Sequence, residues 1–290
     1  MDAISDDGAY GMTTIAFIGS VFSPYYAWSK KRNPFNHCAI NVALYGPRQN
    51  RWAMTERGAG SVTAERDVFQ VGPSALSWDG KTLIIDVSEM SVPVPRKMRG
   101  RIRVTPEYLN PNEHIIDDQG KHRWQPVAPR TRVDVAFDDP GISWSGRGYF
   151  DSNNGDEPLE SAFRYWDWSR AVLPHGETAI FYNTDLWNGT RRNLAIKLDA
   201  SGETIELINR PEAALPPTKV WRIARRTRAD ENAPVRVLKT LEDTPFYSRS
   251  IIESTLFGAP CKAVHETLSG ARFRSPIVKA MLPFRMPRIP

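Results

Sequence analysis

The stretch RVDVAFDDPG, residues 132–141, carries the pattern that decides the fold. Valine or phenylalanine occupies every second position of its first six residues, as in a β-strand with one buried face. The DDPG that follows is a turn sequence. Similar runs recur along the chain, between turn sequences such as WDGK at 78–81 and SNNGDEP at 152–158. Many strands at close spacing predict barrels or sandwiches rather than β-α-β units.

The composition agrees with an all-β fold that contains little helix. The 290 residues include 19 glycines and 23 prolines, and aromatic residues make up 10% of the chain. Such a profile is typical of a loop-rich β protein rather than a helical bundle or a disordered chain. One short amphipathic helix is expected after Ser275, in the sequence SPIVKAMLPFRMPR.

A faint internal repeat suggests two units of similar size. At an offset of about 140 residues, Trp28 matches Trp168 and Tyr26 matches Trp166. A repeat of about half the chain indicates two similar β units. We therefore expect an N-terminal unit over residues 1–142 and a C-terminal unit over residues 143–290.

Charge and motifs exclude several functional classes. The net charge of +5 and the pI of about 9.2 favour an anionic partner such as nucleic acid or a phospholipid surface. We find no P-loop, GxGxxG, GxSxG or HExxH motif, and the five histidines and two cysteines lack metal-ligand spacing. The sequence MDAISDDGAYGM has no basic residue and does not resemble a signal peptide. No metal, nucleotide cofactor or disulfide is expected, and the cytoplasm is the expected compartment.

A dense block from residue 122 to residue 170 combines aromatic and acidic side chains. It reads HRW, then WSGRGYFDSNNGDEPLE, then FRYWDWSR. The first and third residues of a strand segment share a face. His122 with Trp124, and Tyr149 with Asp151, would then form two pairs. Two such strands side by side would place an acid among aromatic rings.

That arrangement suits the protonation of an alkene. An acid in an apolar pocket is poorly solvated as a carboxylate, so its pKa rises and it can remain protonated near neutral pH. Aromatic faces stabilise the resulting cation by about 2 kcal/mol or more when the site is desolvated. A nearby histidine could orient the acid or deprotonate the attacking water.

More ordinary interpretations of the same residues also stand. HRW and YFD could be common strand residues with core rings, and Asp151 could simply open a turn. Asp156 and Glu157 are adjacent and would point to opposite faces of a strand, unlike a glycosidase pair. Asp167 is expected in a barrel core with a salt bridge. The basic run WRIARRTR from Trp221 is expected on a solvated strand face rather than in a nucleic-acid patch, and no nucleic-acid partner is expected.

Longer blocks resemble the carotenoid 1,2-hydratases, also called hydroxyneurosporene synthases, of phototrophic bacteria. They extend over nearly the whole chain. These blocks are FSPYYAW at 22–28, NHCAINVALYG at 36–46, RWAMTERG at 51–58, GPSAL at 72–76, HRWQPVAPRTRVDV at 122–135, GYFDSNNGDEPLE at 148–160, FRYWDWSRA at 163–171 and LPFRMPR at 282–288.

The resemblance implies two tandem lipocalin-like β-barrel units packed together. It also implies a catalytic set of Asp151, His122, Tyr149 and Trp124, with no cofactor. Asp151 would protonate C-2 of an acyclic carotenoid such as neurosporene or lycopene, Trp124 and Tyr149 would flank the cation, and water would add at C-1. His122 or the Asp151 carboxylate would accept the last proton. As candidate substrate-binding residues we add Trp166, Trp168, Tyr26 and Trp28.

A carotenoid dissolves in the bilayer, so a hydratase must meet the membrane. We expect a cytoplasmic protein in peripheral contact with the inner or intracytoplasmic membrane. The tail at 279–290 could bind a leaflet surface or cap the second barrel. Two other functions stay open on the sequence alone: a non-catalytic lipocalin-like carrier of a hydrophobic pigment, and a terpenoid cyclase on the same fold.

Overall fold

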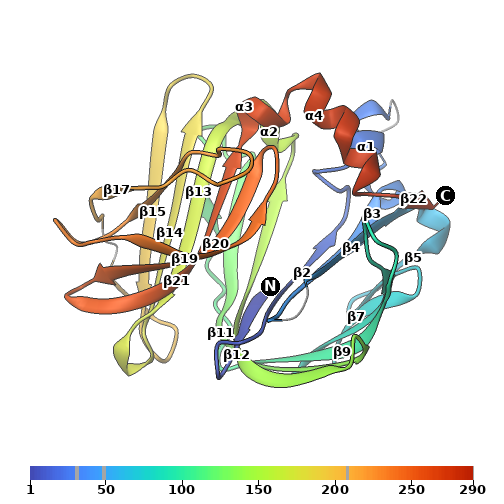
Figure 1. Ribbon diagram of the computed structural model, residues 1–290, viewed down its shortest axis with the longest axis horizontal. Coiled ribbons are helices and arrows are strands. Elements are labelled where there is room, and N and C mark those ends of the chain that lie inside the picture. The colour runs from blue at the N-terminus through green and yellow to red at the C-terminus, as the bar shows by residue number, and fades with distance from the viewer. Residues whose placement is uncertain (30–32, 48–49, 207–208, 290) are drawn as a thin grey trace. The chain divides into compact units, whose positions relative to one another are not determined.

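The computed structural model describes residues 1–29, 33–47, 50–206 and 209–289 (Figure 1). Strands dominate it, so the all-β class is confirmed. The helix expected after Ser275 is present as α4, Pro276–Met281. In the described part of the chain, no helix has both the length and the apolar character needed to cross a bilayer.

The described residues form two compact units, each built from separate segments of the chain. Unit 1 contains Met1–Leu109, Val127–Asp151 and Lys279–Pro290, and unit 2 contains Asn110–Pro126 and Ser152–Val278. The long strands β11 and β12 contribute residues to both units. These units are defined by proximity in space, so the tandem repeat with a division between residues 142 and 143 stays a prediction.

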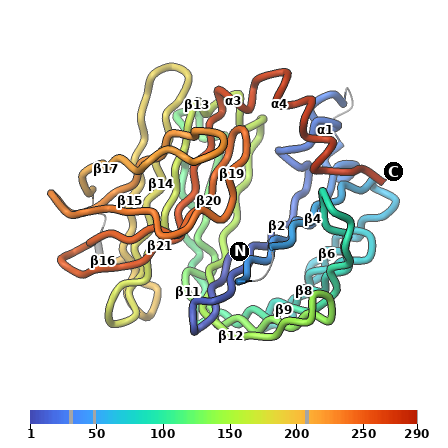
Figure 2. The backbone as a smooth tube through the Cα atoms, in the orientation of Figure 1, coloured from blue at the N-terminus to red at the C-terminus, as the bar shows by residue number. Residues whose placement is uncertain are grey.

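The strands of unit 1 form a large sheet that curves into a wall, as the tube in Figure 2 shows for β2, β4, β6, β8 and β9. Its order is β22-β4-β3-β2-β1-β12-β11-β9-β8-β7-β6-β5. The strands are β1 (Asp2–Ser5), β2 (Gly11–Phe17), β3 (Cys38–Tyr45), β4 (Arg51–Arg57), β5 (Val62–Ala64), β6 (Val68–Val71), β7 (Ser74–Trp78), β8 (Leu83–Met90), β9 (Lys97–Pro106), β11 (His122–Asp139), β12 (Ile142–Gly155) and β22 (Arg288–Ile289). The short helical segments are α1 (Pro24–Trp28), η1 (Pro34–Asn36), η2 (Ala59–Ser61) and η4 (Leu282–Phe284).

The alternating pattern of the sequence explains the core of unit 1. Along β11, Val133, Val135 and Phe137 are buried in one cluster with residues of β1, β2, β8 and β9. The intervening residues Asp134 and Ala136 are exposed. The stretch that predicts a half-buried strand therefore forms one.

The tail of the chain packs on unit 1. Its last strand, β22, runs parallel to β4, with Arg288 opposite Glu56. Met286 is buried against Ala39 and Met54. The tail therefore contributes to unit 1, and the expectation that it caps the second barrel is wrong for these residues.

Unit 2 is built on a seven-stranded antiparallel sheet and a separate hairpin. The sheet order is β16-β15-β14-β13-β21-β20-β19, and β17 pairs with β18. The strands are β10 (His114–Ile115), β13 (Phe163–Val172), β14 (Thr178–Leu186), β15 (Arg191–Leu198), β16 (Thr204–Glu206), β17 (Glu212–Leu215), β18 (Arg225–Arg228), β19 (Arg236–Asp243), β20 (Tyr247–Leu256) and β21 (Ala259–Ser269). Short helical segments are α2 (Leu159–Ala162), η3 (Pro174–Gly176) and α3 (Gly270–Phe273).

The basic run of unit 2 is not a solvated strand face, and that expectation is wrong. Only residues 225–228 of the run form a strand, and Arg225 and Arg228 are buried. Arg226 Nε donates to Asp167 Oδ2 at 2.9 Å, and its Nη2 donates to Asp185 Oδ1 at 2.8 Å. Carboxylates of the sheet and the backbone carbonyls of Pro216 and Arg210 satisfy these arginines.

Candidate active site

Tyr149 and Asp151 lie on one face of β12 in unit 1. Phe150, between them, packs against the core of the unit. The two neighbours therefore point to the opposite face, as the period of a strand requires. The Tyr149 hydroxyl donates to Asp151 Oδ2 at 3.3 Å, and Tyr149 is only 1% exposed. The sequence correctly predicts this pair.

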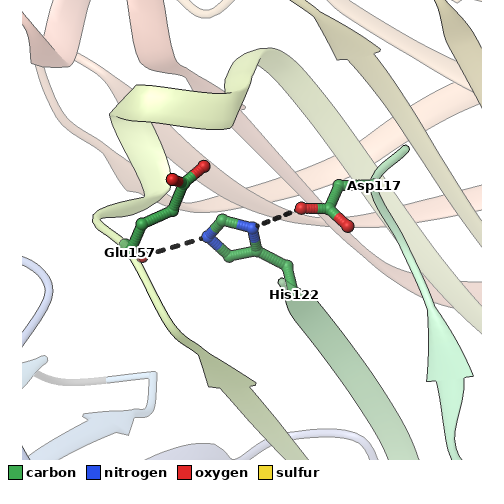
Figure 3. Close-up of side chains that lie close together, drawn as sticks. All are labelled: Asp117, His122 and Glu157. Atoms are coloured by element: carbon green, nitrogen blue, oxygen red, sulfur yellow. Dashed lines mark hydrogen bonds and ion pairs between the residues drawn. The ribbon is translucent and has the colours of Figure 1, made fainter. Parts of the chain in front are cut away.

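His122 begins β11 in unit 2 and is held at both ring nitrogens (Figure 3). Nδ1 lies 2.9 Å from Asp117 Oδ2, and Nε2 lies 3.1 Å from the backbone oxygen of Glu157. A carboxylate and a carbonyl both accept hydrogen bonds, so each nitrogen must carry a hydrogen. His122 is therefore an imidazolium whose two N–H groups are occupied. In this arrangement neither nitrogen can take a proton from water.

The charge of His122 is balanced by Asp117. Burial by itself raises the pKa of the Asp117 carboxyl, but hydrogen bonds from His122 and from the Lys121 backbone outweigh it. The net effect holds the pKa of Asp117 below its ordinary value, so the carboxylate form is favoured. Asp117, His122 and the Glu157 carbonyl thus form a buried, charge-neutral group, which we call the His122 clamp.

The His122 clamp also contains ligand types that bind metals. One ligand atom from each of Asp117, His122 and Glu157 lies within 4.8 Å of the others. Carboxylate and imidazole ligands suit several divalent cations. However, Lys121 Nζ holds the Glu157 carboxylate at 2.8 Å, and His122 Nδ1 is already bonded to Asp117. A cation would have to displace both interactions, so these contacts favour the hydrogen-bonded clamp.

Aromatic rings surround Trp124, which is the second member of the predicted pair His122 and Trp124. Trp124 is fully buried, and its ring centroid lies 5.6 Å from that of His114 and 5.4 Å from that of Tyr182. Tyr182 in turn lies 5.7 Å from Trp166. These buried rings of unit 2 form a continuous aromatic surface inside the unit, and aromatic faces can stabilise a cation.

A hollow of about 220 Å³ lies beside this aromatic surface in unit 2. Tyr182 belongs to both features, which connects the hollow to Trp124 and Trp166. The lining combines aliphatic and polar side chains and consists of Ile115, Ile116, Tyr182, Thr184, Arg192, Asn193 and Leu194.

The other predicted substrate-binding residues have different surroundings. Trp168 is 4% exposed and lies two positions after Trp166 on β13, so the two share a face. Tyr26 of α1 lies in unit 1, where its ring centroid is 4.9 Å from that of His37. Trp28, at the end of the same helix, is 60% exposed. The structure groups Trp166 with Trp124 through Tyr182, whereas Tyr26 and Trp28 belong to unit 1.

Asp167, the other buried acid of the aromatic block, has a structural role. Asn183 Nδ2 donates to its Oδ1 at 2.7 Å, and Arg226 Nε donates to its Oδ2 at 2.9 Å. Burial raises its pKa to about 6, against the opposing effect of Arg226. Both oxygens are occupied by these donors, so the expectation of a core salt bridge is confirmed.

Sequence reasoning missed Asp117 and Tyr182. Asp117 precedes His122 by five residues, across the turn that joins β10 to β11. A short strand, a DDQG turn and a histidine form a local signal that could have revealed the pair. Tyr182 lies in an ordinary apolar strand, and its contact with Trp124 depends on the tertiary fold.

Comparisons with known proteins identify relatives over the full length of the chain. A family model described as carotenoid hydratase CrtC matches residues 14–290. A Thiocapsa roseopersicina protein named acyclic carotenoid 1,2-hydratase is 51% identical over 292 residues, covering 100% of this chain and 72% of that protein. Proteins of the same name from Rubrivivax gelatinosus (46% identical, covering 99% and 72%) and Rhodobacter capsulatus (40%, covering 94% and 97%) also match. These findings confirm the family resemblance.

Proposed function

The chain belongs to the carotenoid hydratase family, and from this premise we propose that it adds water to the C1=C2 double bond of acyclic carotenoids. The observation that carries the proposal is the similarity to named acyclic carotenoid 1,2-hydratases, at 51% and 46% identity over nearly the entire chain. Neurosporene, lycopene and their hydroxylated derivatives are the proposed substrates.

The proposed reaction starts with Asp151. Its carboxylic acid protonates C-2 of the terminal double bond and leaves a tertiary cation at C-1. Water then forms the new C–O bond at C-1, and the oxonium loses a proton. Carbon gains one hydrogen and one hydroxyl in total, so the reaction balances without an oxidant or a reductant. The hydrogen bond from Tyr149 to Asp151 supports this role because it fixes the acid beside an aromatic ring.

We propose that the aromatic residues stabilise the cation. Tyr149 and Trp124 are almost fully buried, at 1% and 0% exposure. Low solvent access strengthens the attraction between a cation and an aromatic face. Substituting either ring by alanine should therefore lower turnover more than substrate binding. Equal losses in turnover and binding would instead identify the rings as pocket walls.

We propose that His122 orients rather than transfers protons. Both of its nitrogens donate to fixed acceptors within the His122 clamp. Trp124 follows it by two residues on β11, so the clamp fixes the strand that carries this ring. Loss of His122 would then act through the placement of Trp124.

Product analysis tests the proposed function directly. Purified protein is incubated with lycopene and, separately, with neurosporene in ¹⁸O-labelled water. The products are separated by chromatography and analysed by mass spectrometry. A 1-hydroxy-1,2-dihydro product with labelled oxygen is expected. An Asp151→Asn variant should lose activity by about 10²-fold or more, since it cannot donate the proton. Asp67→Asn, at an exposed position, is the matched control.

The outcomes of this experiment separate the alternatives. A pigment carrier would bind the carotenoid and return it unchanged. A cyclase would give a product without labelled oxygen. Full activity in Asp151→Asn would remove Asp151 as the proton donor while leaving the hydratase activity itself in place.

We also propose peripheral contact with an anionic membrane surface through α4 and η4. Ile277 and Phe284 are 75% and 82% exposed, although they are large apolar residues. Lys279 and Arg285 flank them and match the negative charge of phospholipid headgroups. Phe284→Ser should weaken sedimentation with vesicles that contain an anionic lipid. Ser substitution of Ile115, which is 53% exposed in unit 2, serves as the control.

A further inference from the structure

A second aspartate lies on the strand beside Tyr149. In the sheet of unit 1, Asp2 of β1 is the direct partner of Tyr149 on β12. On its other side, Asp2 is the direct partner of Thr13 on β2. Directly opposed residues of antiparallel strands have Cβ atoms about 4.5–5.5 Å apart. Tyr149, Asp2 and Thr13 therefore form a row across three neighbouring strands.

This row lies on the same face of the sheet as Asp151. Ala3, Met12 and Phe150, the chain neighbours of the three residues, all pack in or against the core of unit 1. Side chains alternate along a strand, so the members of the row point to the other face. Asp151 is two positions after Tyr149 on β12 and is the diagonal neighbour of Asp2, at a typical distance of about 7–8 Å.

The row is also buried. Asp2 is 6% exposed, Thr13 is 2% exposed and Tyr149 is 1% exposed. Aspartate is rarely buried to this extent unless it is paired with another group. The Thr13 hydroxyl oxygen is buried and has no hydrogen-bond partner among the described residues. A hydroxyl of this kind, next to a carboxyl group, can hold a water molecule.

The hydration chemistry donates one proton to C-2 and removes another from the water that attacks C-1, so it contains an acceptance step as well as a donation step. The two nitrogens of His122 are occupied in the His122 clamp and are closed to this task. We propose that Asp2 is the second carboxyl group of the reaction and that it accepts the proton of the water that attacks C-1. This assignment rests on the proposed hydratase function.

The proton balance of the cycle follows from two carboxyl groups that share one proton. Asp151 begins as the acid and Asp2 as the carboxylate. Asp151 gives its proton to C-2, water bonds to C-1, and the oxonium gives its proton to Asp2. The proton then returns from Asp2 to Asp151 through the hydroxyl of Tyr149, which donates to Asp151 and belongs to the residue directly opposite Asp2. Both carboxyl groups therefore have the same protonation at the end of a turnover as at its start.

Deuterium exchange distinguishes donation from acceptance. Wild type, Asp2→Asn, Asp151→Asn and the exposed control Asp67→Asn are incubated with lycopene in D₂O. Product and recovered lycopene are then analysed by mass spectrometry. Asp2→Asn should hydrate about 10²-fold more slowly than wild type, as expected for loss of a general base. It should still return lycopene that carries deuterium at C-2, because Asp151 delivers a deuteron to C-2 and the cation then loses the original C-2 hydrogen to the Asp151 carboxylate. Asp151→Asn should give neither product nor exchange.

Three results would overturn the assignment. Hydration by Asp2→Asn at the rate of Asp67→Asn would show that Asp2 accepts no proton. Loss of both hydration and exchange in Asp2→Asn would show that Asp2 acts on the donation step instead. Absence of any hydrated product from wild type would refute the proposed function itself, and the assignment with it.

A conservative variant keeps the test valid if Asp2→Asn folds poorly. Asp2→Glu retains the carboxylate and should recover hydration by at least tenfold over Asp2→Asn. The midpoints of thermal unfolding are compared for both variants. Recovery that followed only the folded fraction, with equal activity per folded molecule, would assign Asp2 a structural role.

Discussion

Two buried histidines of unit 2 differ in how many acceptors surround them. His122 is 1% exposed and His265 is 0% exposed, and each lies on a strand. His122 has an acceptor at each nitrogen, a carboxylate and a carbonyl. His265 donates from Nε2 to the Arg226 carbonyl at 2.7 Å, whereas its Nδ1 has no partner among the described residues.

This difference sets the charge of each ring. Two acceptors require two N–H groups, so His122 is charged and is balanced by Asp117. One acceptor requires one N–H group, so His265 is neutral. Burial lowers its pKa to about 4, and the nearby charge of Arg225 acts in the same direction. Burial alone therefore does not determine the protonation of a histidine. The number and kind of its neighbours decide it.

Removing the counter-charge of His122 should cause the largest loss in the free energy of unfolding. In Asp117→Ala the imidazolium loses its carboxylate inside the protein, where an unpaired charge is poorly solvated. Breaking a buried ion pair costs about 3–5 kcal/mol. We expect a fall of this size in the free energy of unfolding, measured with urea at pH 7.

Asp118→Ala is the matched control for this change. Asp118 is the next residue but is exposed, with contacts to Asn188 and Arg192. Surface ion pairs contribute about 0–1 kcal/mol, so this variant should lose little stability. Equal losses from the two substitutions would mean that His122 is neutral and that the proposed difference from His265 does not exist.

The sequence predicts the fold class well because the signal is local. The alternation in residues 132–137 and the turn residues that follow specify a strand and its end without reference to distant parts of the chain. The basic run from Trp221, expected on a solvated strand face, shows where local signals fail. Only residues 225–228 form a strand, and Arg222 adopts a φ of 53° before it. The fold of this segment depends on carboxylates from β13 and β14.

The candidate site could be predicted only in part, for a similar reason. Tyr149 and Asp151 are two residues apart, so the period of the strand places them on one face. The neighbour of Tyr149 on the next strand, Asp2, is 147 positions away in the sequence and becomes visible only through the sheet register. The partners of His122 likewise depend on a turn and on a backbone carbonyl, which residue identity does not reveal.

Lowering the pH should destabilise the protein through His265, by somewhat less than the loss expected for Asp117→Ala. Its pKa is about 4 in the folded protein, against an ordinary value of 6.5. For a base with a lowered pKa, the stabilisation is present above about pH 6.5 and is lost as the pH falls to about 4. The shift corresponds to about 3 kcal/mol. His265→Gln keeps a donor for the Arg226 carbonyl and should remove this loss.

The measurement is the difference in unfolding free energy between His265→Gln and wild type at several values between pH 4 and pH 7. Asp167, whose pKa is raised to about 6, contributes with the opposite sign in this range. It is present in both proteins, so its contribution cancels. His175→Asn, at an exposed position, is the matched control. A constant difference for His265→Gln as well would show that His265 binds protons equally in the folded and unfolded proteins, so that burial does not lower its pKa.

The smallest loss of stability should come from a substitution that crowds the ring of His122 without removing either of its hydrogen-bond acceptors. A Cβ on Gly155 would lie 2.7 Å from His122 Cδ2 and 3.2 Å from Nε2. Gly155→Ala must therefore displace the ring or the strand and lengthen the bond to the Glu157 carbonyl. Overpacking of this kind costs about 1–3 kcal/mol. Gly60→Ala, where a Cβ would meet no atom within 4 Å, is the control.

If the Nε2 bond helps to hold the charge, Gly155→Ala should also move the ¹⁵N signal of His122 Nε2 toward that of a neutral ring. An unchanged signal with lowered stability would mean that Asp117 alone maintains the imidazolium, and that one acceptor of the right charge is sufficient.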